Sequence, residues 1–292
     1  MKISVLITTR NRRSDLYFCL KSLILCRPSP YEIIVVDNAS SDKTEQMIKT
    51  IFSNKVKYFR EERRGIPYGR NSSIYHSSGD ILAFVDDDCI VNQRWIEFIL
   101  KAFRKLPSIV GLVGKVENYF VCNPYAATEQ CWYVYWRLKT LGFIDKKQEI
   151  LSGDIIDFKN VAFKAEFIRK FKFNETMSTG DFGVEDREIS WRIMSHVGNA
   201  KKLYYYPAVE ILHKNNIDWY KLLKRRFAHG LEMARLIEKR KKDYKKVEYK
   251  LIFNRFQISN VWVNYSITQM SKIKNKFDKI IFIIFFTLLP FV

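Results

Sequence analysis

Short apolar runs alternate with segments of helical periodicity along the first third of the chain. The runs predict four strands, at Ile3–Thr8, Tyr31–Val36, Val56–Phe59 and Ile81–Val85. Helices are expected between them: one with Ser14 as its N-cap, one that carries Met47, Ile48 and Ile51, and one near Gly69–Ser77. The resulting β-α-β-α-β-α-β order is typical of a parallel sheet with helices packed on its faces, which indicates the α/β class.

Polar residues follow three of the predicted strands directly, at Thr8–Arg10, Asp37–Asn38 and Asp86–Asp88. Because right-handed crossovers bring the carboxyl ends of parallel strands to one edge of the sheet, we expect a binding site there. Three carboxylates after a buried strand are costly to fold unless they are hydrated, paired or bound to a cation. Asp86–Asp88 therefore suggest a divalent cation that holds an anion such as a diphosphate. The alternative is a solvated turn whose aspartates cap the next helix.

The chain has 292 residues, 47% of them hydrophobic, which is enough for one large α/β domain, alone or with a C-terminal extension. Lys and Arg outnumber Asp and Glu by 50 to 31, and much of the excess lies in residues 201–292, where the counts are 20 and 7. A basic tail of this kind is compatible with nucleic acid, acidic lipid headgroups or water as its surroundings.

The five cysteines form no CxxC pair, and the apolar stretch Met1–Thr9 is too short for a signal peptide. We therefore expect reduced thiols and a cytoplasmic location. The chain contains neither GxGxxG after the first strand nor GxxxxGK(S/T). The absence of both fingerprints disfavours a Rossmann dehydrogenase and a P-loop enzyme.

Several motifs, in the same order along the chain, resemble the family 2 glycosyltransferases. They are Val5–Arg12, Ile33–Asp42, Gly69–Asn71, Phe84–Asp88, Val184–Asp186, Trp191-Arg192 and the segment from Pro207 to His213. The resemblance covers residues 1–215 and implies the GT-A fold, a Rossmann-like mixed sheet flanked by helices. It implies a nucleotide-binding half at 1–117 and an acceptor and catalytic-base half at 118–215. Residues 216–292 would form a helical extension that is basic and apolar.

The resemblance implies a nucleotide-binding set, namely Thr8, Thr9, Arg10, Asp37, Arg70, Asn71 and Asp86. Asp37 would accept a hydrogen bond from the base, and a carboxylate suits the imide N–H of uracil or thymine. Arg70 would also offset charge on the diphosphate, while the alternative is that Arg70 and Asn71 only begin a surface helix. Asn160 falls where the family has an asparagine near the donor sugar.

Asp88, Asp86 and His213 correspond to the family's site for Mn²⁺ or Mg²⁺. Asp88 would be the direct ligand, and Asp86 would face the ribose or a metal-bound water. His213 would complete the metal shell or touch the diphosphate, and the alternative is a structural histidine after an apolar strand. Few protein ligands suffice for a cation that is bound mainly through its substrate.

Glu185 and Asp186 resemble the family's ED motif at the start of a helix, in which the aspartate is the catalytic base. An inverting transfer needs one carboxylate opposite the leaving nucleotide to deprotonate the acceptor hydroxyl. The resemblance gives that role to Asp186 and a supporting or acceptor-binding role to Glu185. The alternative is that the pair only complements the positive end of a helix.

The expected reaction is the metal-dependent, inverting transfer of one sugar from a nucleotide diphosphate, with UDP favoured, to a hydroxyl on a glycan or lipid-linked glycan. The QxxRW motif of processive members is absent, which favours single-sugar transfer. The aromatic segment Glu117–Glu149 either stacks on acceptor sugar rings or packs in the core.

Two alternative functions stay open. A nucleotidylyltransferase would need a glycine-rich phosphate loop near the first strand, which the chain lacks. A noncatalytic module that binds nucleic acid explains the basic tail but leaves the acidic motifs without a purpose, so no nucleic-acid partner is expected.

The tail is expected to hold a basic helix over Trp219–Lys246, a mixed segment Leu251–Ile273 and an apolar run Ile280–Val292. The apolar run is shorter than the roughly 20 residues that a membrane-spanning helix needs. We expect peripheral attachment to the inner face of the membrane, with lysines on anionic headgroups. The alternatives are a truncated transmembrane segment and a dimer interface in a homo-oligomer.

Overall fold

The computed structural model describes residues 1–120, 122–141, 148–149, 156–177, 185–197, 202–225, 227, 270–273, 275 and 279–280. The chain divides into two compact units: Met1–Glu117 with Asp145–His213, and Asn118–Ile144 with Lys214–Val292. The candidate site lies in the first unit. The predicted domain boundaries and the roles of the two predicted halves stay predictions.

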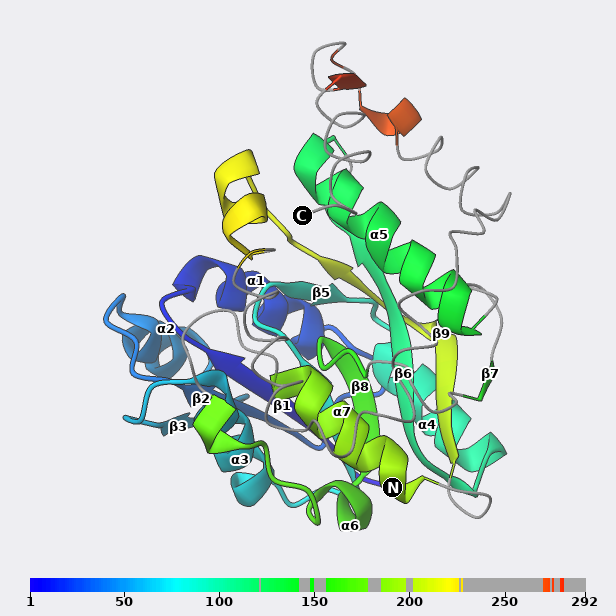
Figure 1. The fold of residues 1–292 in the computed structure, drawn as a ribbon. Coiled ribbons are helices and arrows are strands. Elements are labelled where there is room, and N and C mark those ends of the chain that lie inside the picture. The colour runs from blue at the N-terminus through cyan, green and yellow to red at the C-terminus, as the bar shows by residue number, and fades with distance from the viewer. Residues whose placement is uncertain are drawn as a thin grey trace. The chain divides into compact units, whose positions relative to one another are not determined.

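The first unit begins with the predicted alternation of strands and helices. Its elements are β1 (Ile3–Thr9), α1 (Arg13–Ile24), β2 (Glu32–Asp37), α2 (Thr44–Ile51), β3 (Lys57–Arg60), α3 (Ile66–His76) and β4 (Ile81–Val85). The strands are parallel and lie in the order β3-β2-β1-β4, which confirms the predicted parallel sheet. Helix α3 packs on β1 and β2 (Figure 1).

The sheet continues with antiparallel strands. The elements that follow are β5 (Cys89–Val91), α4 (Trp95–Lys105), β6 (Ile109–Asn118), β7 (Gln148–Glu149), β8 (Asn160–Lys164), α6 (Ala165–Ile168), the 3-10 helix η1 (Glu175–Met177), α7 (Glu185–His196) and β9 (Lys202–His213). From β4 the strand order runs β8-β6-β9-β5, with β8 antiparallel to β4 and β5 antiparallel to β9. The result is a mixed sheet flanked by helices (Figure 1), which confirms the predicted fold class.

The inner parallel strands lie in the core, whereas β3 at the edge of the sheet is partly exposed. Every residue of β2 and β4 is buried, which is why these strands have continuous apolar runs rather than an alternating pattern. Leu16, Leu20 and Leu23 of α1 are fully buried as well, as their spacing predicts. This core fixes the positions of the polar residues that follow the strands.

Helix α1 does not begin as predicted. It begins at Arg13, and Ser14 is therefore not its N-cap. The Arg13 N–H donates to Asp42 Oδ2, in the loop after β2, at 2.9 Å. A residue from the neighbouring loop thus satisfies the start of the helix, and such a contact cannot be read from the local sequence.

Helix α3 begins before the predicted start at Gly69. Its first residue is Ile66, and Pro67 lies in its first turn, where a missing N–H is tolerated. The Gly65 N–H just before the helix donates to Asn38 Oδ1 at 2.7 Å. The polar turn after β2 therefore also fixes the start of α3.

The second unit contains helix α5 (Pro124–Leu141). A small buried cluster in this unit consists of Ala127, Cys131 and Ile273. Glu129 of α5 accepts hydrogen bonds from Asn215 Nδ2 at 2.5 Å and from Arg225 Nη1 at 3.0 Å. The described parts of the C-terminal third therefore pack on α5.

Most of the predicted tail lies outside the described residues. Of the basic helix predicted over Trp219–Lys246, only 219–225 and 227 are described, and these are helical. Most of Leu251–Ile273, and all of Ile280–Val292 except its first residue, also lie outside them. Within the described part of the chain, no helix has the length and apolar character that crossing a membrane requires. The predicted membrane attachment stays a prediction.

Candidate active site

The three polar strand ends meet, as their parallel arrangement predicts. Thr9 and Asp37 are register partners at the ends of β1 and β2. Thr9 Oγ1 donates to Asp87 Oδ2, just after β4, at 2.6 Å. The carboxyl edge of the parallel sheet therefore brings residues from three strand ends into one site.

Asp37 is fully buried at this edge. Its Oδ1 accepts the Ser40 N–H at 2.8 Å, and its Oδ2 accepts the Tyr58 hydroxyl at 2.9 Å. Arg60 Nη1 lies 3.6 Å from the same Oδ2. Burial and the bond to Asp37 raise the pKa of Tyr58, so its hydroxyl stays a neutral donor. Together these contacts fix the orientation of the Asp37 carboxylate.

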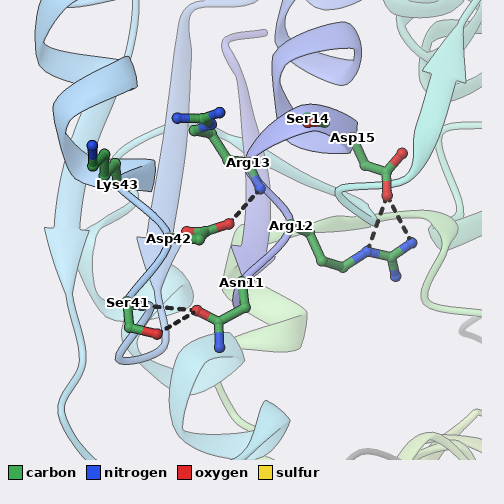
Figure 2. A pocket seen from close by; sticks show the side chains of 8 residues that line it. All are labelled: Asn11, Arg12, Arg13, Ser14, Asp15, Ser41, Asp42 and Lys43. Atoms are coloured by element: carbon green, nitrogen blue, oxygen red, sulfur yellow. Dashed lines mark hydrogen bonds and ion pairs between the residues drawn. The ribbon is translucent and has the colours of Figure 1, made fainter.

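The loops after β1 and β2 are tied to each other. Asn11 has a left-handed backbone conformation, with a φ of 52°, and its Oδ1 accepts the Ser41 N–H at 2.8 Å. A groove of about 560 Å³ lies along these loops and is lined by Asn11, Arg12, Arg13, Ser14, Asp15, Ser41, Asp42 and Lys43 (Figure 2). Figure 2 shows Arg12 extending away from Arg13 and Lys43, on the side of Asp15.

The rim of the site next to β1 depends on a glycine. Thr8 and Arg10, both predicted to line the nucleotide pocket, are half-buried at the end of β1. Gly69 of α3 lies so close to Thr8 that a Cβ atom at position 69 would overlap the Thr8 methyl group. The glycine therefore lets α3 approach the end of β1.

The three aspartates after β4 point to different partners. Asp86 Oδ1 lies 3.6 Å from Arg70 Nη2. Asp87 Oδ1 lies 3.5 Å from Arg12 Nε, and Asp88 Oδ2 lies 2.8 Å from Arg12 Nη2. Asp86 is half-exposed, whereas Asp87 and Asp88 are buried. The middle and last aspartates therefore share one guanidinium, and the first one uses another.

The buried aspartates differ in their protonation. Burial raises the pKa of Asp87 to about 8, although Arg12 opposes the shift. Burial alone would also raise the pKa of Asp88, but His213 and Arg12 hold it well below its ordinary value. Of the two, Asp88 is therefore the residue whose surroundings favour the charged carboxylate that a metal ligand needs.

His213 reaches Asp88 through strand pairing. Strand β5 follows the aspartates directly, and its first residue, Cys89, is the register partner of His213 at the end of β9. His213 Nε2 lies 3.1 Å from Asp88 Oδ2. The structure thus brings two of the three predicted metal ligands together, while Asp86 turns to Arg70.

A divalent cation fits this pair through its ligand chemistry. Asp88 offers a carboxylate oxygen and His213 an imidazole nitrogen. In this structure the positive charge beside the Asp88 carboxylate comes from Arg12. Among the described residues, no three His, Cys, Asp or Glu side chains gather as a ready metal site. The arrangement therefore suits a cation that takes its other ligands from substrate and water.

Arg70 connects the strand edge to the predicted catalytic base. Glu185 and Asp186 lie in the first turn of α7. Arg70 Nη1 pairs with Asp186 Oδ1 and lies 3.5 Å from Glu185 Oε1. Asp186 is 30% exposed, yet desolvation of its carboxylate, opposed by Arg70 and reinforced by Glu185, raises the pKa of Asp186 to about 7. A carboxyl group with such a pKa suits proton transfer at neutral pH.

Two predicted site residues are engaged in holding the fold. Asn71 Nδ2 donates to the Phe173 carbonyl at 3.0 Å, and the Phe173 N–H donates back to Asn71 Oδ1 at 2.8 Å. Asn160 is fully buried, and its Nδ2 donates to the carbonyls of Lys115 and Val209 at 2.9 and 2.7 Å. The contacts predicted for Asn71 with the nucleotide and for Asn160 with the sugar stay predictions that this geometry does not favour.

Arg12 and Tyr58 belong to the site, although the motifs gave neither of them a role. The sequence could have identified Tyr58, because Tyr58 and Arg60 are two residues apart in β3 and therefore lie on the same face, beside β2. The signal for Arg12 is its charge, three residues after β1 and facing acids that follow a neighbouring strand. Both residues lie close to a carboxylate that the motifs did identify.

Comparison with known sequences gives one family and several relatives. The profile of the family described as glycosyl transferase family 2 matches residues 4–171, more than half of the chain. Glycosyltransferase AglE of Haloferax volcanii is 36% identical over 100 residues, which are 32% of this chain and 33% of that protein. The glucosyl-dolichyl phosphate glucuronosyltransferase of the same organism is 23% identical over 230 residues, 75% of this chain and 72% of that protein. The match to AglE thus spans only about a third of that relative.

Two solved structures show the same fold. One is the mannosyltransferase PcManGT from Pyrobaculum calidifontis in complex with GDP-Man and Mn²⁺, with a TM-score of 0.62 and 16% identity, covering 92% of this chain and 74% of that one. The other is GalNAc-T7 with UDP, GalNAc and Mn²⁺, with a TM-score of 0.56 and 20% identity, covering 74% and 44%. These similarities confirm the GT-A arrangement of the sheet.

Proposed function

The chain belongs to glycosyl transferase family 2, and from that premise we propose that it transfers one sugar from a nucleotide diphosphate to an acceptor hydroxyl by metal-dependent inverting displacement. That it is a glycosyltransferase follows from the family; the donor, the metal and the stereochemistry are the proposal. One observation carries it: the buried Asp37, the Asp88–His213 pair and the Arg70–Asp186 pair lie along one sheet edge and the facing end of α7. The family match favours sugar transfer over a nucleotidylyltransferase and over nucleic-acid binding.

The nucleotide would lie on the ends of β1 and β2. Asp37 would accept a hydrogen bond from the base, and its orientation is fixed by Tyr58 and Arg60. Thr8, Thr9 and Arg10 would line the same pocket, which agrees with their place at the end of β1. We favour UDP because the uracil imide N–H suits a carboxylate. The two related structures hold GDP-Man and UDP, so GDP and dTDP belong in the test as well.

The cation would be Mn²⁺ or Mg²⁺, held by Asp88 and His213, with Asp86 facing the ribose or a metal-bound water. Support comes from the contact between Asp88 and His213, from the lowered pKa of Asp88 and from the Mn²⁺ in both related structures. When bound, such a cation would neutralise the diphosphate and stabilise the leaving nucleotide.

Asp186 would act as the base. Its carboxylate would take the proton of the acceptor hydroxyl while that oxygen attacks the anomeric carbon and the bond to the diphosphate breaks. A single displacement of this kind inverts the anomeric configuration. The pKa of about 7 supports the role, because the group can be deprotonated before the reaction and can still accept a proton near neutral pH. Glu185 would support Asp186 or bind the acceptor.

The acceptor would be a glycan or a lipid-linked glycan. One relative's name specifies a glucosyl-dolichyl phosphate, a lipid-linked sugar. The aromatic segment 117–149 would meet the acceptor; the side chains of Trp132, Tyr135 and Trp136 within it lie outside the described residues. The basic tail would attach the protein to the inner face of the membrane, with a homo-oligomer as the alternative. Both proposals rest on residue type and charge alone.

A transfer assay tests the reaction. The full chain is incubated with UDP-, GDP- and dTDP-sugars, Mn²⁺ and a glycan acceptor, and release of the nucleotide diphosphate is measured. We expect turnover with one nucleotide, a loss of about 1,000-fold in Asp186→Asn, which keeps the size of the side chain, and inverted product by NMR. The control is Glu97→Gln, which removes an exposed ion pair on α4 and should leave turnover unchanged. Equal turnover in Asp186→Asn, or a retained configuration, would refute the mechanism.

A further inference from the structure

We propose that Arg70 is a positioning residue for the base Asp186, in place of the nucleotide contact that the resemblance implies. The inference rests on the proposed function and adds a residue to its mechanism. Arg70 lies on α3, and both the sheet edge and the start of α7 contact its guanidinium. Its role follows from the side chains that fix the guanidinium in place and from the carboxylates that the guanidinium contacts.

Two aromatic rings hold it. The guanidinium carbon lies 5.3 Å from the ring centre of Phe158 and 5.2 Å from that of Phe173. The two rings contact each other edge to face, with their centres 4.9 Å apart. Guanidinium groups bind favourably to aromatic rings at such distances, most strongly when buried. The protein framework alone, without a substrate, therefore sets the position of the Arg70 head group.

Three carboxylates surround it. Nη1 pairs with Asp186 and lies 3.5 Å from Glu185 Oε1, and Nη2 lies 3.6 Å from Asp86 Oδ1. The Arg70 side chain is only 8% exposed. The N–H groups of its fork are therefore directed at protein carboxylates, which leaves little of the guanidinium for a phosphate.

Other arginines are better placed for a nucleotide. Arg12, beside Asp88, is 42% exposed, and Arg60, beside Asp37, is 35% exposed. Both flank the carboxylates expected at the two ends of the nucleotide. Arg70 differs from them in burial and in its pairing with the base.

Without Arg70, two neighbouring carboxylates would lose their shared positive partner. Glu185 and Asp186 are adjacent in the first turn of α7, and like charges at that distance repel each other. The base would then move away from the position in which Arg70 holds it, and small displacements of a catalytic group reduce rates about 100-fold. Nucleotide binding at the ends of β1 and β2 would be unaffected.

The experiment separates turnover from nucleotide affinity. For Arg70→Gln and Arg70→Lys in the full chain, we measure kcat with the sugar nucleotide that the wild type uses. The Kd of the corresponding nucleoside diphosphate with Mn²⁺ is measured by calorimetry. We expect kcat to fall about 100-fold in Arg70→Gln while Kd stays within about threefold. Arg70→Lys keeps one charge without the fork and should recover part of kcat.

A matched control is Arg94→Gln. Arg94 also pairs with a carboxylate, that of Glu97, at 2.7 Å, and its guanidinium carbon lies 4.8 Å from the ring centre of Phe98. Unlike Arg70, it is exposed, at the N-cap of α4. It should change neither kcat nor Kd. If Arg70→Gln fails to unfold cooperatively, Arg70→Lys decides alone: a lower kcat with unchanged Kd supports the proposal.

Three outcomes overturn it. One is a Kd at least tenfold weaker in either folded Arg70 variant with kcat unchanged at saturation, which is the signature of a nucleotide contact. Another is the absence of any effect on either quantity. A wild-type chain that binds no nucleotide with Mn²⁺ would refute the proposed function, and this inference with it, and is recognisable because no variant is involved.

Discussion

Buried carboxylates lie at both ends of the parallel strands, but the two ends differ in how fully hydrogen bonds and positive charges compensate them. At the amino end, the Glu32 side chain is 3% exposed and accepts hydrogen bonds from Ser4 Oγ at 2.5 Å and the Ser78 N–H at 2.7 Å. Lys57 Nζ pairs with its other oxygen at 2.7 Å. At the carboxyl end, Asp87 and Asp88 share Arg12, whereas Asp86 shares Arg70 with Asp186 of α7.

The difference is visible in the pKa values. Burial alone would raise the pKa of Glu32, but Lys57 and Ser4 lower it to about 2. At the other end, burial raises the pKa of Asp87 to about 8 and that of Asp186 to about 7. The amino end is therefore electrostatically complete, whereas the carboxyl end carries charge that a cation or a proton would stabilise. The incompletely compensated carboxylates thus lie at the end of the sheet where we propose that ligands bind.

The largest effect should come from Glu32→Ala. It leaves Ser4 and Lys57 without their partner and should reduce the free energy of unfolding by about 3 kcal/mol, measured by urea denaturation. The activity of the folded fraction should not change, because the site is at the other end. Glu45→Ala, which removes an exposed ion pair with Lys49, is the control and should leave stability nearly unchanged. If Glu32→Ala were as stable as the wild type, the contacts of Glu32 at the amino end would not stabilise the fold as we infer.

The pH dependence of catalysis should follow Asp186. The base must be deprotonated, and its pKa is about 7. We expect kcat/KM to rise with pH through about 7 and to fall by about tenfold per unit below it. The measurement is a pH profile with melting curves at each pH as the control for folding. A rate that is constant from pH 5 to 8 would assign the base to another group.

The stability of the metal-free protein should depend on pH with two opposite limbs. The raised pKa values of Asp87 and Asp186 mean that the folded state binds more protons than the unfolded state between about pH 4 and 8, so stability falls as pH rises across that range. Glu32 and Asp88, whose pKa values are lowered, stabilise the fold above about pH 4.5, and this contribution is lost as pH falls towards 2 and below. The melting temperature should therefore be highest near pH 5.

Each limb has its own control. Asp87→Asn should make the limb above pH 5 shallower, with Asp186 supplying the remaining slope. Glu32→Gln should make the limb below pH 5 shallower, with Asp88 supplying the remaining slope. A melting temperature that rises steadily from pH 5 to 8 in the metal-free protein would show that the carboxyl end is not strained by its charge.

The smallest effect should come from Gly69→Ala. The added Cβ would overlap the Thr8 methyl group and move α3 away from the end of β1. We expect a loss of about 1 kcal/mol in stability and a severalfold weaker Kd for UDP. Ser72→Ala, on the same helix, serves as the control. An unchanged Kd would show that nucleotide binding does not depend on the contact between Gly69 and Thr8.

The sequence predicted what depends on local pattern and strand order. The apolar runs located β1 to β4, and the parallel order of these strands explains why Thr9, Asp37 and Asp87 meet. Both predictions use only local sequence, because the polar residues directly follow the apolar run of their own strand. The start of α1, by contrast, depends on Asp42 in another loop, and the prediction of Ser14 as its N-cap was wrong.

Side-chain partners could not be predicted in the same way. Asp88 and His213 are 125 residues apart and meet only because β5 pairs with β9 in one register. Arg70 was expected beside the nucleotide, yet it contacts Asp186, 116 residues away. Asn160 was expected near the sugar, yet its amide binds strand carbonyls inside the sheet. The resemblance had assigned Asp88 and His213 to one metal site, whereas the observed partners of Arg70 and Asn160 are set by packing between distant segments and were not predicted.

The central claim is that the carboxyl end of the sheet binds a metal and a nucleotide together. The most direct test is a calorimetric titration of UDP into the full chain, with and without Mn²⁺, for the wild type and for Asp88→Asn. We expect UDP to bind the wild type tightly only with Mn²⁺. Asp88→Asn, shown to be folded by its melting curve, should lose this metal-dependent binding. Equal UDP binding without Mn²⁺, or in Asp88→Asn with Mn²⁺, would contradict it.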